Sequence, residues 1–214
     1  MARRFVAERR RDPYYRAAQR EGLRSRAAFK LAYLDQRFHL LHPGLRVLDL
    51  GAAPGGWSLV AAQAVGPRGA VVAVDLRPIE PAEGVRSVRG RVGDPALLAR
   101  LGTERFDLVL SDLSPRISGA YATDHARSVD LVRAAWRLAS SVLAPGGAFV
   151  AKVFDGELVE PFEAELAPSF VSVRRTKPPA SREASSEIYL VARGFRPGAD
   201  AAPAPSPGGR GSAI

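Results

Sequence analysis

Residues 47–58 read Val-Leu-Asp-Leu-Gly-Ala-Ala-Pro-Gly-Gly-Trp-Ser, a short apolar run that leads directly into a glycine-rich turn. The apolar run is typical of a buried strand, and the residues after the turn are typical of the start of a helix. Glycine lets the backbone approach a ligand closely, and the first turn of a helix offers free N–H groups. Pro54 interrupts the Gly-x-Gly-x-x-Gly pattern of a pyrophosphate site, so the turn favours a nucleoside without phosphates over a dinucleotide such as NAD.

Short apolar runs alternate with helical patterns after Gly44, which predicts an α/β fold with a mostly parallel sheet and crossover helices. The expected parallel strands are 45–50, 70–75, 85–88, 106–111 and 147–154. A long helix is expected at about residues 124–142. Two late strands, 170–174 and 187–192, have no helix between them, so we expect an antiparallel hairpin at the edge of the sheet.

The length of 214 residues and the hydrophobic content of 46% predict one domain of ordinary size. Residues 1–12 are rich in arginine and poor in apolar side chains, so they are expected to be a mobile basic arm. Residues 13–196 are the expected folded domain, which opens with two basic helices. The apolar stripe of the second helix consists of Leu31, Leu34, Phe38 and Leu41. Residues 197–214, rich in Pro, Ala, Gly and Ser, are expected to be disordered.

The formal net charge of +9 favours a polyanionic partner, with nucleic acid as the first candidate and an anionic membrane surface as the second. Cysteine is absent, which excludes disulfides and thiolate metal sites. The three histidines lack metal-ligand spacing, so no metal site is expected. Because there is no long apolar run and no signal-peptide pattern, we expect a soluble cytoplasmic protein without membrane attachment.

Only three of the 31 basic residues are lysines: Lys30, Lys152 and Lys177. Arginine does not lose its proton in a protein, whereas lysine is a compact and titratable amine. A site that needs such an amine is where lysine would resist replacement by arginine, although chance survival is the alternative. Lys152 ends an apolar run that reads as a buried strand, which makes it the first candidate for chemistry.

Asp75 ends the second expected strand, 24 residues after Gly51. An acidic residue in this place meets ribose hydroxyls in nucleotide-binding βαβ units. The whole segment 49–58 resembles the cofactor motif of the FtsJ (RrmJ) family of S-adenosylmethionine-dependent ribosomal RNA 2′-O-methyltransferases. Further matches follow in chain order at residues 25–31, 111–115, 143–147, 152–154, 181–182 and 186–189. The resemblance covers roughly residues 13–195.

This resemblance implies a Rossmann-like methyltransferase fold whose sheet ends in an antiparallel strand, with S-adenosylmethionine as the methyl donor. It also implies methylation of a uridine ribose in large-subunit ribosomal RNA, within the large ribosomal subunit, by a protein that acts as a monomer. The family's catalytic set falls on Lys30, Asp112, Lys152 and Glu187. Its cofactor contacts fall on Gly55, Trp57, Asp75 and again Asp112.

The four catalytic candidates suit methyl transfer to a hydroxyl, which is a poor nucleophile until its proton is removed or its developing negative charge is stabilised. Lys152 can serve either purpose. A second cation such as Lys30 would favour the neutral amine, whereas Asp112 and Glu187 would favour the ammonium. General base and oxyanion stabiliser are therefore both open. Asp112 and Lys152 each end a parallel strand, at the edge where such sheets carry their sites.

Three candidates also have purely structural explanations. Asp112 could cap a turn, Glu187 could pair with Arg182, and Trp57 could pack in the core. Lys152 has the weakest such explanation, because an unpaired ammonium in a buried strand is costly.

One position departs from the family. Arg91 stands where the family has the acidic residue that reads the adenine side of the cofactor. A guanidinium does not accept the adenine amino proton, so either Asp94 or backbone groups would have to take that role.

Aromatic and basic residues interleave ahead of Lys30, which suits contact with RNA phosphates and stacking on an unpaired base. This expected RNA-binding segment consists of Tyr14, Tyr15, Arg16, Arg20, Arg24 and Arg26. Two other functions are weighed against the RNA methyltransferase. A methyltransferase for a small molecule or a protein would not need the basic arm, and a non-catalytic RNA-binding assembly factor would have no reason to keep all four catalytic candidates.

Overall fold

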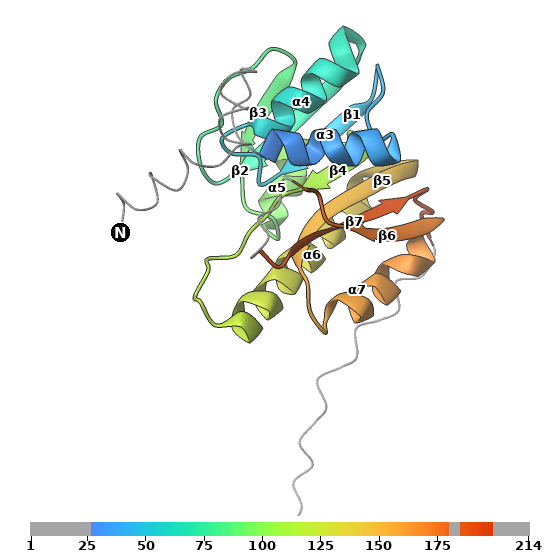
Figure 1. Cartoon of the computed structure of the whole chain (residues 1–214). Helices are drawn as coiled ribbons and strands as arrows, with labels where there is room; N and C mark the ends of the chain where they lie inside the picture. The colour runs from blue at the N-terminus through green and yellow to red at the C-terminus, as the bar shows by residue number, and fades with distance from the viewer. Residues whose placement is uncertain (1–26, 180–184, 199–214) are drawn as a thin grey trace, which may run out of the picture.

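The computed structural model describes residues 27–179 and 185–198. The predicted basic arm, the first predicted helix, the RNA-binding segment and nearly all of the predicted tail lie outside the described residues. A seven-stranded sheet in the order β3-β2-β1-β4-β5-β7-β6 forms the centre of the molecule (Figure 1). Its strands are β1 (Arg46–Leu50), β2 (Ala70–Asp75), β3 (Val85–Arg89), β4 (Phe106–Ser111), β5 (Leu143–Phe154), β6 (Ser172–Thr176) and β7 (Glu187–Arg193).

The five strands from β1 to β5 are mutually parallel, which confirms the predicted parallel sheet. The predicted pairing of the two late strands is also confirmed, because β6 and β7 are antiparallel to each other. The two strands do not form a separate hairpin at the edge, because β7 also pairs with β5. Of the two, only β6 is an edge strand. The strand β7, the last one within the described residues, therefore lies inside the sheet, where both of its sides are hydrogen bonded.

Helices cover both faces of the sheet (Figure 1). They are α3 (Ala27–Phe38), α4 (Gly56–Val65), α5 (Pro95–Leu101), α6 (Tyr121–Val142) and α7 (Val159–Leu166), with short 3-10 turns at Gly66–Arg68 and Ala167–Ser169. Side chains of β1 alternate between the two faces, as the period of a strand requires. Leu48 and Leu50 join the apolar cluster that contains the buried residues of α5, α6 and α7, while Val47 joins the cluster beneath α3 and α4.

Several element boundaries differ from the prediction, and β6, for example, is shifted toward the C-terminus from the expected 170–174. The strand β5 begins at Leu143, because Leu143 pairs with Phe106 before the register shifts toward the Leu108 and Ala148 pair. The long helix begins at Tyr121, earlier than its apolar pattern indicates. The first described helix ends at Phe38, and Leu41 lies beyond it, where the Asp35 carboxylate accepts hydrogen bonds from the backbone N–H groups of residues 40 and 41.

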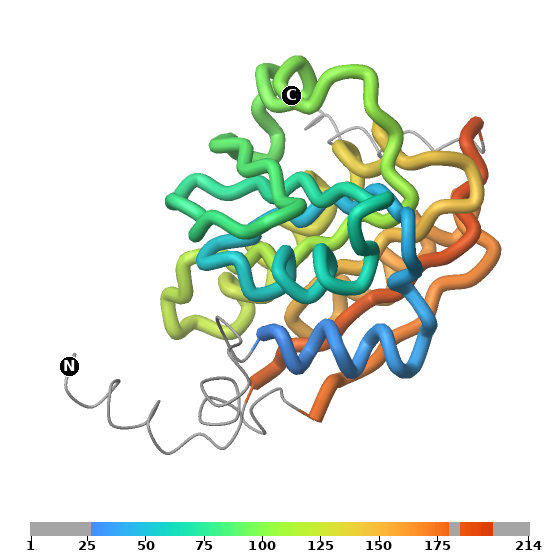
Figure 2. Tube along the Cα trace, turned by 90° about the horizontal axis from the view of Figure 1, so that it is seen from above, coloured from blue at the N-terminus to red at the C-terminus, as the bar shows by residue number. Residues whose placement is uncertain are grey.

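The order in which strands are added to the sheet reverses at β1: β2 and β3 lie on one side of it, and β4 lies on the other. The carboxyl ends of the parallel strands β1, β2, β4 and β5 meet at one edge of the sheet. A crevice at such a reversal is where open α/β sheets bind ligands. The antiparallel strand β7 begins at this same edge, with Glu187 opposite Phe154 and Tyr189 opposite Lys152. Figure 2 shows α3 beside these late strands, although the segments are far apart in the chain. Residues from five strands and from α3 therefore meet at this edge.

Gly51 directly follows β1, at a point where two loops approach closely. Its φ is +80°, and a Cβ there would lie 3.0 Å from Leu113 Cδ2 and 3.1 Å from Leu113 N. Both backbone conformation and space therefore require glycine. Gly44 has a similar φ of +90°, but a Cβ there would meet no other atom within 4 Å.

These two glycines give a matched pair of substitutions. Gly44→Ala should cost about 1–2 kcal/mol of unfolding free energy from the left-handed backbone alone. Gly51→Ala should cost about 1–3 kcal/mol more, because the added methyl group overpacks the loop after β4. Urea unfolding of both variants measures the difference, and equal losses would show that the approach of Leu113 has no energetic consequence.

Candidate active site

Two lysines and two carboxylates form a connected network at the carboxyl edge of the sheet. Lys30 Nζ donates to Glu187 Oε2 at 2.7 Å. Lys152 Nζ donates to the backbone oxygen of Asp112 at 3.0 Å and lies 3.1 Å from Asp112 Oδ1 and 3.7 Å from Glu187 Oε1. Both lysines are only 6% exposed. The structure therefore brings together all four residues that the sequence predicts as catalytic.

Register and strand ends explain how these side chains meet. Asp112 directly follows β4, and Lys152 lies in β5, the next strand of the sheet. Glu187 is the first residue of β7, on the other side of β5. Lys30 comes from α3 and reaches the network across 157 residues of chain. Glu187 thus lies between two cations that belong to different layers of the fold.

The charges of the two lysines act on Glu187. Burial alone would raise the pKa of the Glu187 carboxyl, but the positive charges of Lys30 and Lys152 and the hydrogen bond from Lys30 outweigh burial. The pKa of Glu187 consequently lies below its usual value. Glu187 is ionised at neutral pH and holds both ammonium groups.

Tyr189 is a site residue that the sequence analysis did not assign. Its hydroxyl donates to Asp112 Oδ1 at 2.9 Å, and its ring lies 5.8 Å from Lys30 Nζ. The side chain is fully buried. Period-two alternation along β7 places Tyr189 on the same face as Glu187, and this was the signal in the sequence that could have identified it.

Trp57 connects the helix that carries Lys30 to the rest of the site. Its indole Nε1 donates to the backbone oxygen of Ala27 at 2.6 Å, at the start of α3. Its ring lies 5.7 Å from the ring of Tyr189, and the side chain is 2% exposed. These contacts are those of core packing, which was the structural explanation considered for Trp57. A cofactor contact by Trp57, and likewise by Gly55, stays a prediction, since neither lines the cavity described next.

A cavity of about 810 Å³ opens beside Lys152 at the reversal point of the sheet. Its walls come from the loops after β1, β2, β3 and β4. The lining residues include Gly51, Ala53, Asp75, Gly90, Arg91, Val92, Asp112, Leu113 and Lys152. Two of the predicted cofactor contacts, Asp75 and Asp112, are therefore in its wall, and Asp112 belongs to both the cavity and the lysine network.

The carboxylate of Asp75 is fixed by the turn that follows β1. Its Oδ2 accepts from Ala53 N at 2.9 Å, and its Oδ1 accepts from Arg77 N at 2.8 Å. A carboxylate has about four acceptor positions, so each oxygen retains the capacity for another hydrogen bond. Asp75 is thus oriented by the backbone and still able to bind a diol.

The Arg91 end of the cavity has no carboxylate in the position that the resemblance expects. Arg91 lines the cavity together with Gly90 and Val92. Asp94 does not line it, and its Oδ1 accepts from Ala96 N at 2.9 Å as the N-terminal cap of α5. Of the two alternatives for the adenine side, this arrangement favours backbone groups over Asp94.

Asp49 is a fully buried carboxyl on the same face of β1 as α4. Ser58 Oγ donates to its Oδ2 at 2.6 Å, and Oδ1 has no hydrogen-bond partner among the described residues. Burial raises the pKa of Asp49 to about 7, with further contributions from the charges of Asp112 and Asp75, while the Ser58 bond acts in the opposite direction. Three carboxyls, those of Asp49, Asp75 and Asp112, therefore lie near one another at the carboxyl ends of β1, β2 and β4.

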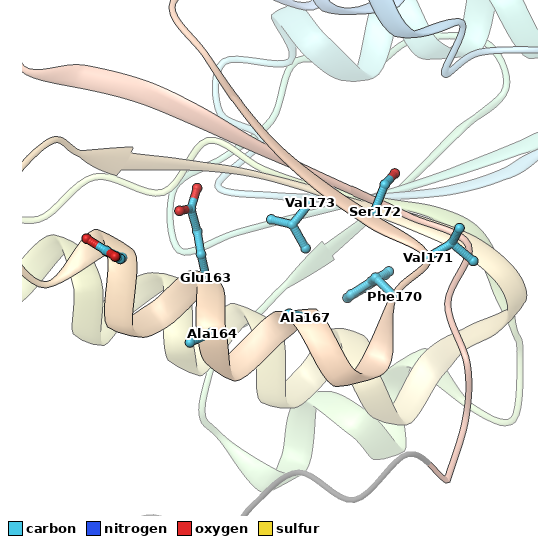
Figure 3. A pocket seen from close by; sticks show the side chains of 8 residues that line it. Glu163, Ala164, Ala167, Phe170, Val171, Ser172 and Val173 are labelled. Carbon is cyan, nitrogen blue, oxygen red and sulfur yellow. The ribbon is translucent and has the colours of Figure 1, made fainter.

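A second hollow, of about 370 Å³, lies between α7 and β6 (Figure 3). Its wall includes Phe170, Val173 and Glu163, and Glu163 is paired with Arg175 at 2.6 Å. The neighbouring Ser172 pairs with Arg193, which lies at the amino-terminal edge of the parallel strands. This hollow is thus at the opposite end of the sheet from the lysine network.

No helix within residues 27–179 and 185–198 has both the length and the apolar character needed to span a bilayer. No group of three or more candidate metal ligands occurs in this part of the chain.

Comparison with known proteins places these features in a family. A profile of the FtsJ-like methyltransferase family matches residues 23–195. The chain is 48% identical over 205 residues to Ribosomal RNA large subunit methyltransferase E of Granulibacter bethesdensis, covering 92% of this chain and 86% of that protein. It is also 48% identical to the protein of the same name from Archaeoglobus fulgidus, with 87% and 97% covered. A crystal structure described as a ribosomal RNA methyltransferase from Plasmodium falciparum is 26% identical, with a TM-score of 0.74 over 80% of this chain and 98% of that one.

The parallel sheet with an inserted antiparallel strand and a crevice at its reversal point defines a Rossmann-like enzyme of the methyltransferase class. The chain belongs to the FtsJ-like methyltransferase family. This confirms the fold and the family that the sequence motifs predict.

The raised pKa of Asp49 predicts how stability changes with pH. From about pH 4 upward the unfolded chain ionises Asp49, whereas the folded protein keeps it protonated up to about pH 7. The Asp49 contribution to stability is therefore complete at low pH and is lost as the pH rises through about 7. Asp49→Asn does not titrate, so the variant should gain unfolding free energy relative to the wild type between about pH 5 and pH 7.

Urea unfolding of both proteins at pH 5, 6, 7 and 8 measures this difference. Ser58→Ala removes a hydrogen bond that lowers the pKa of Asp49, so it should move the pH-dependent range upward. A difference between Asp49→Asn and the wild type that is independent of pH would contradict the assignment.

Proposed function

We propose that this chain transfers a methyl group from S-adenosylmethionine to a ribose 2′-hydroxyl of large-subunit ribosomal RNA. The observation that carries the proposal is the paired, buried Lys152 ammonium at the rim of a nucleoside-sized cavity. The names of the relatives support ribosomal RNA as the substrate class. From the same resemblance we propose that the acceptor is a uridine ribose within the large ribosomal subunit and that the chain acts as a monomer in the cytoplasm.

The residues of the cavity fit such a cofactor. Asp75 keeps acceptor capacity for a ribose diol, and the absence of a side chain at Gly51 leaves room for close approach of the backbone. Gly90 and Val92 offer backbone groups for the adenine. When bound, S-adenosylmethionine supplies an electrophilic methyl group on a positively charged sulfonium.

The lysine network would act on the acceptor hydroxyl. Lys152 donates to Asp112 and faces Glu187, so two carboxylates and a backbone oxygen orient its ammonium. These contacts favour the role in which Lys152 stabilises the developing negative charge of the ribose oxygen over the role of general base. Lys30 binds Glu187 and thereby limits how strongly Glu187 competes for Lys152.

Two alternative functions have weaker support. A non-catalytic RNA-binding assembly factor would not need two buried lysines held by two carboxylates, because such a network is costly to bury. A methyltransferase for a small molecule or a protein would lose activity only weakly as salt is raised, whereas binding to RNA through many basic residues is strongly salt dependent. The salt dependence of methylation separates these classes.

Cofactor binding should depend on Asp75. We expect Asp75→Ala to weaken the affinity for S-adenosylmethionine by at least about tenfold, since it removes up to two charge-assisted hydrogen bonds. Arg91→Ala, in the same cavity, is the matched control and should leave the affinity nearly unchanged. Isothermal titration calorimetry with both variants tests this, and near-normal binding by Asp75→Ala would overturn the nucleoside assignment.

Methyl transfer should depend on the amine of Lys152. We expect Lys152→Arg to fold and to bind cofactor and RNA, yet to transfer methyl groups orders of magnitude more slowly, because a guanidinium neither accepts the hydroxyl proton nor fits an ammonium-sized site. Lys30→Arg should be milder, because a fixed charge beside Glu187 is preserved. Lys177→Arg, at an exposed lysine that donates to the backbone oxygen of Ser185, is the matched control.

The measurement is single-turnover methyl transfer to large ribosomal subunits isolated from cells that lack this protein, followed by mapping of ribose methylation. Single-turnover conditions separate chemistry from binding. Normal transfer by Lys152→Arg would show that the lysine has no catalytic role.

A further inference from the structure

Tyr121 is the only Tyr, Phe or Trp side chain among the described residues that is largely exposed. It begins α6 and exposes 61% of its surface. An exposed aromatic ring is a candidate for contact with a partner, because burying such a ring contributes more than most side chains to binding. Neither the lysine network nor the cavity uses the Tyr121 ring.

The ring is held rigidly. The Tyr121 hydroxyl donates to the backbone oxygen of Asp155 at 2.6 Å. One face of the ring is stacked on the imidazole of His125, with centroids 6.1 Å apart and planes inclined by 10°. His125 is buried and bonded on both sides, through Nδ1 with Phe154 O at 3.0 Å and through Nε2, which accepts from Leu158 N at 3.1 Å. The Tyr121 ring is thus anchored at its hydroxyl and beside His125, while 61% of the surface of the residue stays exposed.

Tyr121 is linked to the ends of both strands that carry the site. The loop of residues 113–120 separates it from Asp112, and its hydroxyl donates to the backbone oxygen of Asp155, which directly follows the strand of Lys152. The loop is itself fixed, because Asp124 accepts hydrogen bonds from Ser118 N at 2.8 Å and Gly119 N at 3.0 Å. Those bonds hold the pKa of Asp124 below its usual value.

The same loop offers a cation and a second apolar group. Arg116 is exposed and lines the outer part of the cavity. Ile117 exposes 60% of its surface. An exposed ring with an arginine and an aliphatic side chain in the adjoining loop, next to the reaction site, matches the chemistry of unpaired nucleotides, whose bases stack on aromatic rings while their phosphates meet cations.

We propose that the exposed ring of Tyr121 is a stacking platform for an unpaired nucleobase next to the ribose that is methylated. This inference rests on the proposed function, since it names the RNA contact of the same site. Stacking on a ring that is already fixed costs little side-chain entropy, so the platform contributes directly to RNA affinity. The proposed platform assigns part of RNA recognition to residues 27–179, in addition to the basic segment predicted before Lys30.

The test uses an RNA fragment that the wild-type chain methylates, with 2-aminopurine in place of the base beside the target ribose. Stacking on a tyrosine changes the fluorescence of this base. Tyr121→Leu removes the ring but keeps an apolar side chain, whereas Tyr121→Phe keeps the ring and removes only the bond to Asp155. Val171→Ala, at a side chain that is 67% exposed next to the opposite edge of the sheet, is the surface control.

We expect Tyr121→Leu to weaken RNA binding by about 5- to 100-fold and to abolish the fluorescence change, because one base–aromatic stack is lost. Tyr121→Phe and Val171→Ala should stay within about twofold of the wild type, and all variants should bind S-adenosylmethionine normally. Equal losses by the Leu and Phe variants would show that Tyr121 only clamps Asp155, and unchanged RNA binding by Tyr121→Leu would place the platform elsewhere; either result overturns the inference. Failure of the wild type to methylate any ribosomal RNA would instead overturn the proposed function.

Discussion

Two buried lysine side chains lie close together in this protein because carboxylates at the ends of two different strands hold them. An unpaired ammonium in a protein interior is costly, and removal of one partner from a buried pair leaves an uncompensated charge. Glu187 pairs with both ammonium groups, with Lys30 on one side and Lys152 on the other. Asp112 supplies the second carboxylate for Lys152. The positions of α3, β5 and β7 relative to each other are therefore tied to the same set of charges.

A layer of aromatic contacts supports this network from behind. Tyr189 donates to Asp112 and packs against Trp57. The indole N–H of Trp57 in turn donates to the backbone oxygen of Ala27, the first residue of α3. The helix that carries Lys30 is consequently held at its start by the tryptophan that follows the glycine-rich turn. The glycine-rich turn and the lysine network thus share one packed unit, which explains why Trp57 is buried away from the cavity.

The three carboxyls near the carboxyl ends of β1, β2 and β4 are the second feature with a functional consequence. Asp49, Asp75 and Asp112 are close enough that the charges of the last two raise the pKa of the first. Asp112 is paired with Lys152, and Asp75 Oδ1 lies 3.6 Å from Arg77 Nε, so the wall of the cavity holds charges of both signs.

The sequence by itself determined the fold class, because period-two and helical patterns are local properties that can be read within each segment. The strand before Gly51, the strand ending at Asp75 and the antiparallel pairing of the last two strands are correct on this basis. The family motifs also named Lys30, Asp112, Lys152 and Glu187, whose charged and chemically specific side chains remain visible in the sequence. Only the tertiary structure decided the contacts between them, because Lys30 and Glu187 are 157 residues apart and no local pattern encodes which partners meet. The same reason applies to Tyr189, to the anchoring of α3 by Trp57 and to the pKa of Asp49, which depend on burial and on charges brought together from separate strands.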